Sequence, residues 1–307
     1  MTEKKHWLGR VYLVFAFALL YLPIFYLIFY SFSTGKSMSN FKGFTFSHYQ
    51  TLFSDSRLIV IVLDTLIVAV LSSLVATIIG TMGALGIYRV QNKHWRNLIL
   101  SLNNILMVSP DVIIGASFLI LFTALGVTLG FGSVLVSHIA FSIPIVVLLV
   151  LPRLREMDAT MIDAARDLGA NGWQILSQVI LPFILPSVFS GYFMAFTYSL
   201  DDFAVTFFVT GNGFATLSVE IYSRARQGIN LEINALSALM FIFSIVLIVG
   251  YYFINHYTNR DVTNVKEGGL ISNETFWIIC HRDRYYQCVI GTGSAPVKSS
   301  FWPRRCG

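Results

Sequence analysis

Charged residues are scarce in this sequence. They make up 12% of its 307 residues, whereas a soluble domain carries about 25%. The polar side chains are therefore too few to cover a water-soluble surface of this size. Apolar residues reach 55% and come in long uncharged runs, which are typical of helices that cross a lipid bilayer. The net charge is +5, and the basic residues cluster between these runs. This placement indicates membrane orientation rather than nucleic-acid binding.

Motifs for several kinds of catalysis are missing as well. The sequence contains no Gly-x-x-x-x-Gly-Lys-Ser/Thr phosphate-binding loop, so any ATP hydrolysis on which this chain depends takes place in a separate chain. Neither Gly-x-Gly-Asp nor His-Glu-x-x-His occurs, which argues against an intramembrane enzyme. We expect this chain to bind no cofactor and no metal.

Six apolar segments are each long enough for the roughly 20 residues that cross the hydrocarbon core. Helices are expected, because no backbone group facing lipid can be left unpaired. The fifth segment exceeds one span, and Gly211-Asn-Gly213 predicts a helix end near Thr210, with residues 214–231 as an external loop that has room for a short surface helix. The sequence therefore predicts an all-α polytopic membrane protein with six transmembrane helices, in segments 11–32, 58–88, 98–126, 130–152, 183–219 and 233–257.

Basic residues in the flanks of these segments predict the orientation, because cytoplasmic loops carry more lysine and arginine. The larger set, closer to the helix ends, comprises Lys4, Lys5, Arg10, Arg89, Lys93, Arg96, Arg153, Arg155, Arg166 and Arg260. The opposite set comprises Lys36, Lys42, Arg57, Arg224 and Arg226. Both termini are therefore predicted to be cytoplasmic. The first apolar run lacks a small-residue cleavage signal, so we expect a retained anchor.

The C-terminal tail, residues 261–307, differs from the rest of the sequence. It holds all three cysteines, Cys280, Cys288 and Cys306, and shows neither a helical nor a strand period. The spacing of Cys280, His281 and Cys288 matches no standard zinc pattern. We therefore expect a poorly ordered cytoplasmic extension with free thiols, or the product of a frameshift or read-through, beyond a transmembrane domain over residues 1–260.

The hydrophilic loop 153–182 lies between the fourth and fifth segments, on the predicted cytoplasmic side. Asp158 or Thr160 can cap a helix start, and Gly169 is well placed to end that helix in a left-handed conformation. One apolar face of this helix is predicted to consist of Met161, Ala165 and Leu168.

A second short helix follows in the same loop. Asn171 can cap its start, and Pro182 is expected to stop it before the fifth span. Its apolar stripe comprises Trp173, Leu176, Val179 and Ile180. Two interpretations remain open from the periodicity: a rigid element that couples a cytoplasmic partner to the membrane helices, or an amphipathic helix that rests at the interface.

The stretch Asp163-Ala-Ala-Arg-Asp-Leu-Gly169, continuing to Val179-Ile-Leu-Pro182, resembles the EAA loop of ABC-importer permeases. Every spacing of that pattern is met, and the one departure is Asp163 where the family usually has Glu. The resemblance implies the type I importer permease fold and a loop that docks into a cleft on an ATPase subunit, which binds ATP and magnesium. The residues that carry this role over are Asp163, Ala164, Ala165, Gly169, Leu181 and Pro182.

Four aspartates fall inside apolar segments: Asp64, Asp111, Asp201 and Asp202. Charged groups in a membrane are costly and by default face a polar pathway or a partner. No lysine or arginine lies within the apolar cores to pair with them, so a lining of one sign would favour a cationic solute. Asp111, Asp201, Asp202 and Tyr198 are the candidate pathway residues. Structural hydrogen bonds are the alternative for each, and the preferred one for Asp64. Asp201 and Asp202 point apart on a helix, so at most one of them is expected to line the pathway.

Over about residues 8–260 the sequence is similar to spermidine/putrescine permeases, in the stretches 109–117, 198–208 and 232–237. This resemblance implies a bacterial cell-membrane subunit that forms a heterodimer with a second permease. It also implies two ATPase copies and an extracytoplasmic polyamine-binding protein. The alternatives are the same machinery for another small solute, such as an iron chelate, thiamine or a phosphonate, or an intramembrane enzyme or scaffold.

Overall fold

The computed structural model describes residues 3–35, 41–227, 231–246, 249–250, 279–280 and 288–289, with side chains for those between 9 and 250. The chain divides into two units, Met1–Ser244 and Ile245–Gly307. The second unit is described at few positions. Two short strands, β1 (Ile279–Cys280) and β2 (Cys288–Val289), pair in antiparallel fashion there, and the sequence does not predict them. The remainder of the predicted tail lies outside the described residues.

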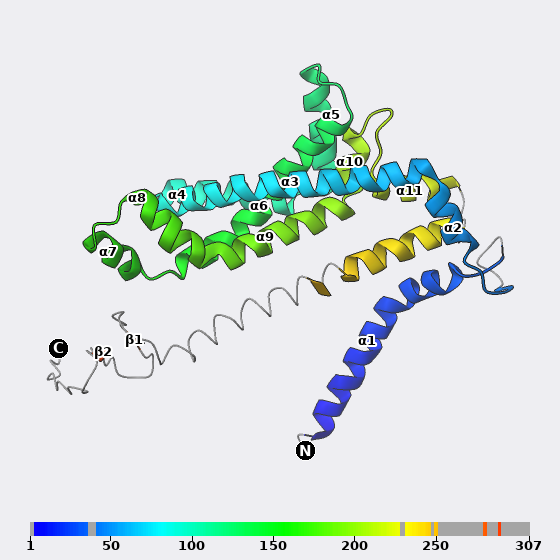
Figure 1. Cartoon of the computed structure of the whole chain (residues 1–307), viewed down its shortest axis with the longest axis horizontal. Coiled ribbons are helices and arrows are strands. Elements are labelled where there is room, and N and C mark those ends of the chain that lie inside the picture. The colour runs from blue at the N-terminus through cyan, green and yellow to red at the C-terminus, as the bar shows by residue number, and fades with distance from the viewer. Residues whose placement is uncertain are drawn as a thin grey trace, which may run out of the picture. The chain divides into compact units, whose positions relative to one another are not determined.

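Four helices of the first unit are long and apolar enough to cross a membrane (Figure 1). They are α1 (Glu3–Tyr30), α3 (Ser56–Arg89), α6 (Phe131–Arg155) and the continuous helix Gly172–Asp201. A fifth span is possible in the bent pair α4 (Lys93–Val108) and α5 (Asp111–Ala124). The all-α membrane architecture is thus confirmed. Of the sixth predicted segment, the structure describes the helix Leu231–Val246 and residues 249–250.

Helix α3 packs against α6 and against α9 (Leu181–Asp201), and these three form the centre of the first unit. Gly80 permits a close approach of α3 to α6, because a Cβ placed there would lie 2.7 Å from the Cβ of Val146. Small residues at helix contacts are typical of membrane bundles, in which packing rather than the hydrophobic effect holds helices together. Val146 is itself fully buried in a cluster with Val150, Leu154 and Ile184.

The prediction of a single straight span in segment 98–126 is wrong. The segment breaks between α4 and α5, whose axes differ by 103°. Ser109 is extended, with ψ of 138°, as expected before a proline, and Pro110 with ψ of 133° precedes the first turn of α5. Because Pro110 also lacks a backbone N–H, the helix cannot be continued through it without loss.

The fifth predicted segment is also divided. Helix α9 ends at Asp201, and a short helix α10 (Ala204–Val209) follows before the turn at Gly211-Asn-Gly213. The predicted end near Thr210 is therefore the end of α10, not of the long helix. Helix α11 (Leu217–Gln227) confirms a short helix in the loop that follows.

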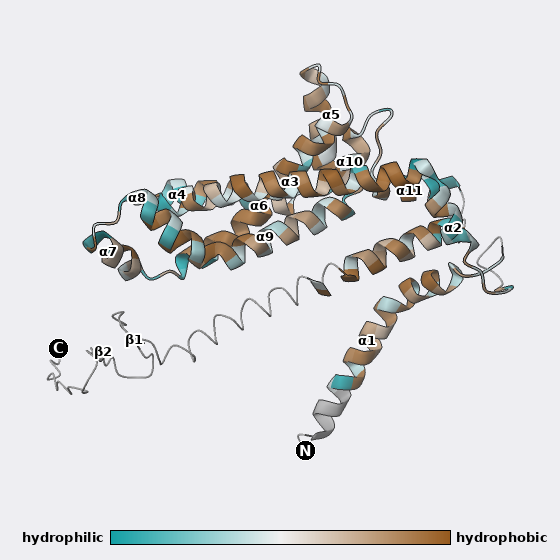
Figure 2. Cartoon of the chain, viewed as in Figure 1, coloured by the Kyte–Doolittle hydropathy of each residue, from teal (hydrophilic) through white to brown (hydrophobic). Residues whose placement is uncertain are grey.

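Ion pairs join α11 to α3 at the end of the unit where α2 (Ser47–Ser54) lies (Figure 1). Glu220 is 7% exposed and accepts from Arg224 at 2.8 Å and from Arg57 at 3.5 Å. Arg224 also lies 3.5 Å from Asp55, the N-cap of α3. Hydrophilic residues gather here and at the opposite end around α7 and α8, with apolar helices between (Figure 2).

Candidate functional site

Helix α7 (Ala159–Asp167) begins the loop that the sequence identifies as functional. The carboxylate of Asp158 accepts a hydrogen bond from the backbone N–H of Thr160 at 3.0 Å, which confirms Asp158 as the cap. This hydrogen bond lowers the pKa of the Asp158 carboxyl below its usual value. The helix ends at Gly169, whose φ of +80° confirms the left-handed conformation.

The loop is anchored on one face and uncovered on the other. Ile162 and Ala165 pack against a buried cluster that includes Ile175. Met161, Leu168 and Trp173 are 45%, 90% and 74% exposed. The predicted apolar face of α7 is therefore partly wrong, because Ile162 takes the inward position expected for Met161 and Leu168. On a helix this short, two adjacent stripes compete, and contact with the core selects between them.

The two side chains that form an ion pair on α7 are both exposed. Arg166 lies 3.3 Å from Asp163, and the two side chains are 66% and 67% exposed. A surface ion pair of this kind contributes little to stability. Ala164 is exposed, whereas Ala165 faces the core. Asp163 and Ala164 are therefore placed where a partner chain could reach them.

The second helix of the loop does not stop at Pro182, contrary to the prediction. Asn171 caps α8 (Gly172–Ile175) in a reciprocal box with Gln174, at 2.9 and 2.8 Å. The helix then passes through a π-turn, η1 (Leu176–Ile180), and continues as α9. The backbone N–H of Leu181 bonds to the carbonyl of Leu176 across the wider π-turn, and Pro182, which has no N–H of its own, follows directly as the second residue of α9.

One continuous helix of 30 residues therefore leads from the Gly169 elbow to the aspartate pair. At 1.5 Å per residue it is about 45 Å long. Its far end is Asp201, which is exposed, and Asp202, which is buried.

Asp202 begins α10. Its carboxylate accepts from the backbone N–H of Val205 at 3.3 Å and of Thr206 at 2.8 Å, and from the Thr206 hydroxyl at 2.8 Å. The side chain is 4% exposed. These bonds satisfy orphan donors at the start of α10, and they favour the structural alternative for Asp202.

His138 on α6 is a residue that the sequence analysis missed. Its ring is fully buried, with Nδ1 2.7 Å from the Ser199 hydroxyl and Nε2 2.8 Å from the Thr206 hydroxyl. Nε2 also lies 3.5 Å from an Asp202 carboxylate oxygen. Ser72 on α3 extends the network to Ser199 at 3.0 Å. The signal that could have identified His138 is that it is the only histidine in the uncharged segment 130–152.

Asp111 and Tyr198, two of the candidate pathway residues, lie in contact with each other. The Tyr198 hydroxyl donates to an Asp111 carboxylate oxygen at 2.8 Å. Asp111 is the first residue of α5, so this bond connects the break in the third segment to α9. Within the described residues, no three of His, Cys, Asp or Glu form a group that could hold a metal ion.

Comparisons with known proteins identify the family of this chain. The family described as "Binding-protein-dependent transport system inner membrane component" matches residues 76–264. The "Spermidine/putrescine transport system permease protein PotC" of Escherichia coli is 37% identical over 82% of this chain and 94% of that protein. The "Putrescine transport system permease protein PotI" of the same organism is 35% identical over 78% and 87%. A chain of a bacterial ABC transporter for alginate import has the same fold, with a TM-score of 0.65 and 20% identity over 84% of this chain and 96% of that chain.

Proposed function

Because the chain belongs to the family of binding-protein-dependent transport system inner membrane components, we propose that it is the permease subunit of an ATP-driven importer for spermidine and putrescine. The proposal treats the chain as a multi-pass subunit of the bacterial cell membrane that has no ATPase site of its own. The distribution of lysine and arginine supports cytoplasmic termini.

The uncovered apolar tip of the loop carries the proposal. Leu168 and Trp173 flank the Gly169 elbow at 90% and 74% exposure, although Ile162 and Ala165 hold the same loop firmly on the core. Exposed apolar patches with polar rims mark interaction sites. We propose that this tip docks into a cleft on an ATPase subunit, and that this subunit binds ATP and magnesium.

The continuous helix from the elbow supplies the mechanical link. When the ATPase subunits close on ATP, the loop moves with them, and helix Gly172–Asp201 transmits that movement without a hinge at Pro182. Its far end meets the Asp111–Tyr198 bond and the cap at Asp202. Movement at the elbow therefore shifts the contacts of Asp111 and Asp202, and the solute pathway opens alternately to each side of the membrane.

The solute is assigned from the relatives and from charge. The two permeases reported above are named for spermidine and putrescine, which are cations. Asp111 and the exposed Asp201 place carboxylates of one sign at helix breaks, where a cation can be attracted. Asp202 contributes to this pathway by fixing the start of α10.

Partner chains complete the proposed assembly. The apolar stretch Gly9–Tyr30 of α1 is not buried by the rest of the described chain, so it can face lipid or a second permease in a heterodimer. A structure related in fold carries a periplasmic solute-bound protein. We propose an extracytoplasmic polyamine-binding protein at the end where α2 and α11 lie, and two ATPase copies at the end of α7.

Uptake of radiolabelled spermidine into vesicles that carry the whole complex tests the proposal. Gly169→Pro is expected to abolish uptake, because proline cannot adopt a φ of +80°. Unlabelled putrescine is expected to compete, whereas thiamine and a phosphonate are not. Unimpaired uptake by Gly169→Pro would refute the coupling role, and absence of polyamine competition would refute the solute.

A further inference from the structure

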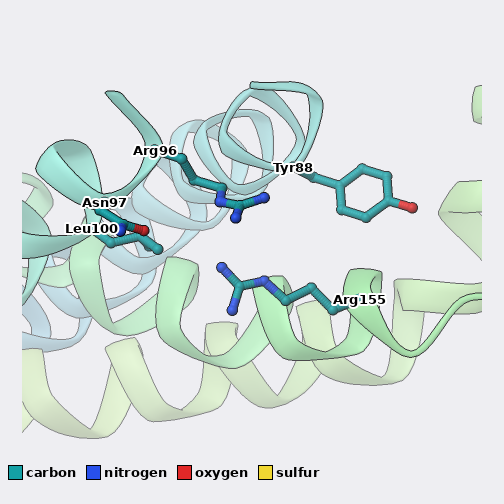
Figure 3. A pocket seen from close by; sticks show the side chains of 5 residues that line it. All are labelled: Tyr88, Arg96, Asn97, Leu100 and Arg155. Atoms are coloured by element: carbon teal, nitrogen blue, oxygen red, sulfur yellow. The ribbon is translucent and has the colours of Figure 1, made fainter. Parts of the chain in front are cut away.

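A cavity of about 390 Å³ lies where the end of α3, the start of α4 and the end of α6 meet. Its lining consists of Tyr88, Arg96, Asn97, Leu100 and Arg155. Figure 3 shows that the guanidinium groups of Arg96 and Arg155 point toward one another from α4 and α6. Two cations thus face each other across an open space.

Neither guanidinium has a counter-charge among the residues that the structure describes. Nearby arginines are different: Arg153 lies 2.9 Å from Glu156, and Arg166 lies 3.3 Å from Asp163. Two like charges that face each other repel, and an anion between them would offset that repulsion. The arrangement is therefore complementary to an anion between the two side chains.

We propose that Arg96 and Arg155 form a binding site for a phosphate group, filled by the headgroup of an anionic phospholipid. Guanidinium groups bind phosphate oxygens with two parallel hydrogen bonds, and two of them can bind one phosphate from opposite sides. The Asn97 amide in the same lining offers a neutral donor.

The surface of α4 favours a lipid over a soluble ion. No residue of α4 is buried, and Trp95, Leu98 and Leu102 are 63%, 49% and 59% exposed. Tryptophan beside basic residues is typical of the membrane–water interface, and the leucines offer a surface for acyl chains. The proposed cytoplasmic side also faces the leaflet that attracts lysine and arginine to anionic lipids.

A lipid in this position would tie α4 to the base of the coupling loop. Arg155 is the last residue of α6, and Asp158 caps α7 three residues later. Further along α4, the Asn103 amide donates to the Pro144 carbonyl of α6 at 3.4 Å. The phosphate would add a second connection at the end nearest the loop. This inference rests on the membrane location of the family and not on the solute.

Native mass spectrometry of the full complex, purified in mixed phosphatidylcholine and phosphatidylglycerol, tests the site. The wild type is expected to retain phosphatidylglycerol in preference to phosphatidylcholine. Arg96→Gln with Arg155→Gln is expected to weaken that retention at least about tenfold, because hydrogen bonds to charged groups are the strong ones. The matched control is Arg89→Gln with Lys93→Gln, which removes the same charge outside the lining and should retain the lipid as the wild type does.

Four results would overturn the proposal. One is equal retention of phosphatidylglycerol by the wild type and the double variant, and another is equal loss in the control. Displacement of the lipid by inorganic phosphate would assign the cavity to a free ion. Retention by the permease alone, but not in the presence of the ATPase, would assign it to an acidic partner surface. If the double variant does not assemble, Arg155→Gln at its exposed position is the decisive single variant, with an expected loss of about tenfold.

Discussion

The hydroxyl of Tyr198 donates a 2.8 Å hydrogen bond to the carboxylate of Asp111, which lies 87 residues earlier in the chain. The two residues belong to α9 and to the first turn of α5. The Tyr198 ring also packs edge-on against Phe141 of α6, with 5.1 Å between ring centroids. Three helices therefore meet at this bond, next to the break after Pro110.

Tyr198→Phe removes the donor and leaves the ring in place. Because hydrogen bonds to a charged group contribute about 1.5–3 kcal/mol, we expect a lower midpoint of thermal denaturation in detergent and slower spermidine uptake. Tyr192→Phe on the same helix is the control, since its ring packs against Phe193 and Phe196 and its hydroxyl makes no hydrogen bond to any residue that the structure describes. Equal effects of the two substitutions would remove any special role for the Tyr198 hydroxyl.

Asp201 and Asp202 are expected to respond differently to replacement by asparagine. Asp202→Asn replaces one of the two carboxylate oxygens that accept from the N–H groups of Val205 and Thr206 with an NH2 donor, so we expect a loss of about 1–3 kcal/mol in stability. Asp201→Asn, at an exposed position, is expected to change stability by less than about 0.5 kcal/mol and to lower spermidine uptake. The checks are thermal denaturation of the purified complex and uptake in vesicles. A stable Asp202→Asn protein, or normal uptake by Asp201→Asn, would contradict the assignment.

His138→Phe tests the buried network directly. Phenylalanine is close in size but leaves the hydroxyls of Ser199 and Thr206 without their ring partner. Each hydroxyl keeps one other partner, Ser72 for Ser199 and Asp202 for Thr206. Each lost hydrogen bond costs about 0.5–1.5 kcal/mol, so we expect a lower denaturation midpoint. His48→Phe is a comparison at a less buried position, where one ring nitrogen contacts the Ser33 carbonyl at 2.9 Å. A His138→Phe protein as stable as the wild type would show that the network contributes nothing.

Local signals predicted the loop well. Asp158, Gly169 and Asn171 act within a few residues of their own positions, and all three have the predicted cap or turn geometry. The long apolar segments likewise predicted α3 and α6 almost to their ends, because a span needs only a sufficient run of apolar residues. Whether the loop and pathway residues act as proposed stays a prediction.

Features that depend on contacts between distant residues were not predictable. Pro182 was predicted to stop the second helix of the loop, but the helix continues through the π-turn η1 and past Pro182 into α9. Segment 98–126 was predicted as one span, but the chain bends by 103° between α4 and α5, and α5 packs against α10. His138 acquires its meaning only from Ser199 and Thr206, more than 60 residues away.

Leu168→Glu tests the uncovered tip of the loop without disturbing its anchored face. The side chain is 90% exposed, so the free energy of unfolding of the permease should change by less than about 0.5 kcal/mol. A carboxylate in an apolar contact leaves a buried charge unpaired, so the ATPase should no longer co-purify. Leu168→Met keeps the apolar character and should preserve co-purification, whereas Ile162→Glu, on the core side, should destabilise the loop itself. Normal recovery of the ATPase with a well-folded Leu168→Glu permease would place the contact elsewhere on the cytoplasmic surface.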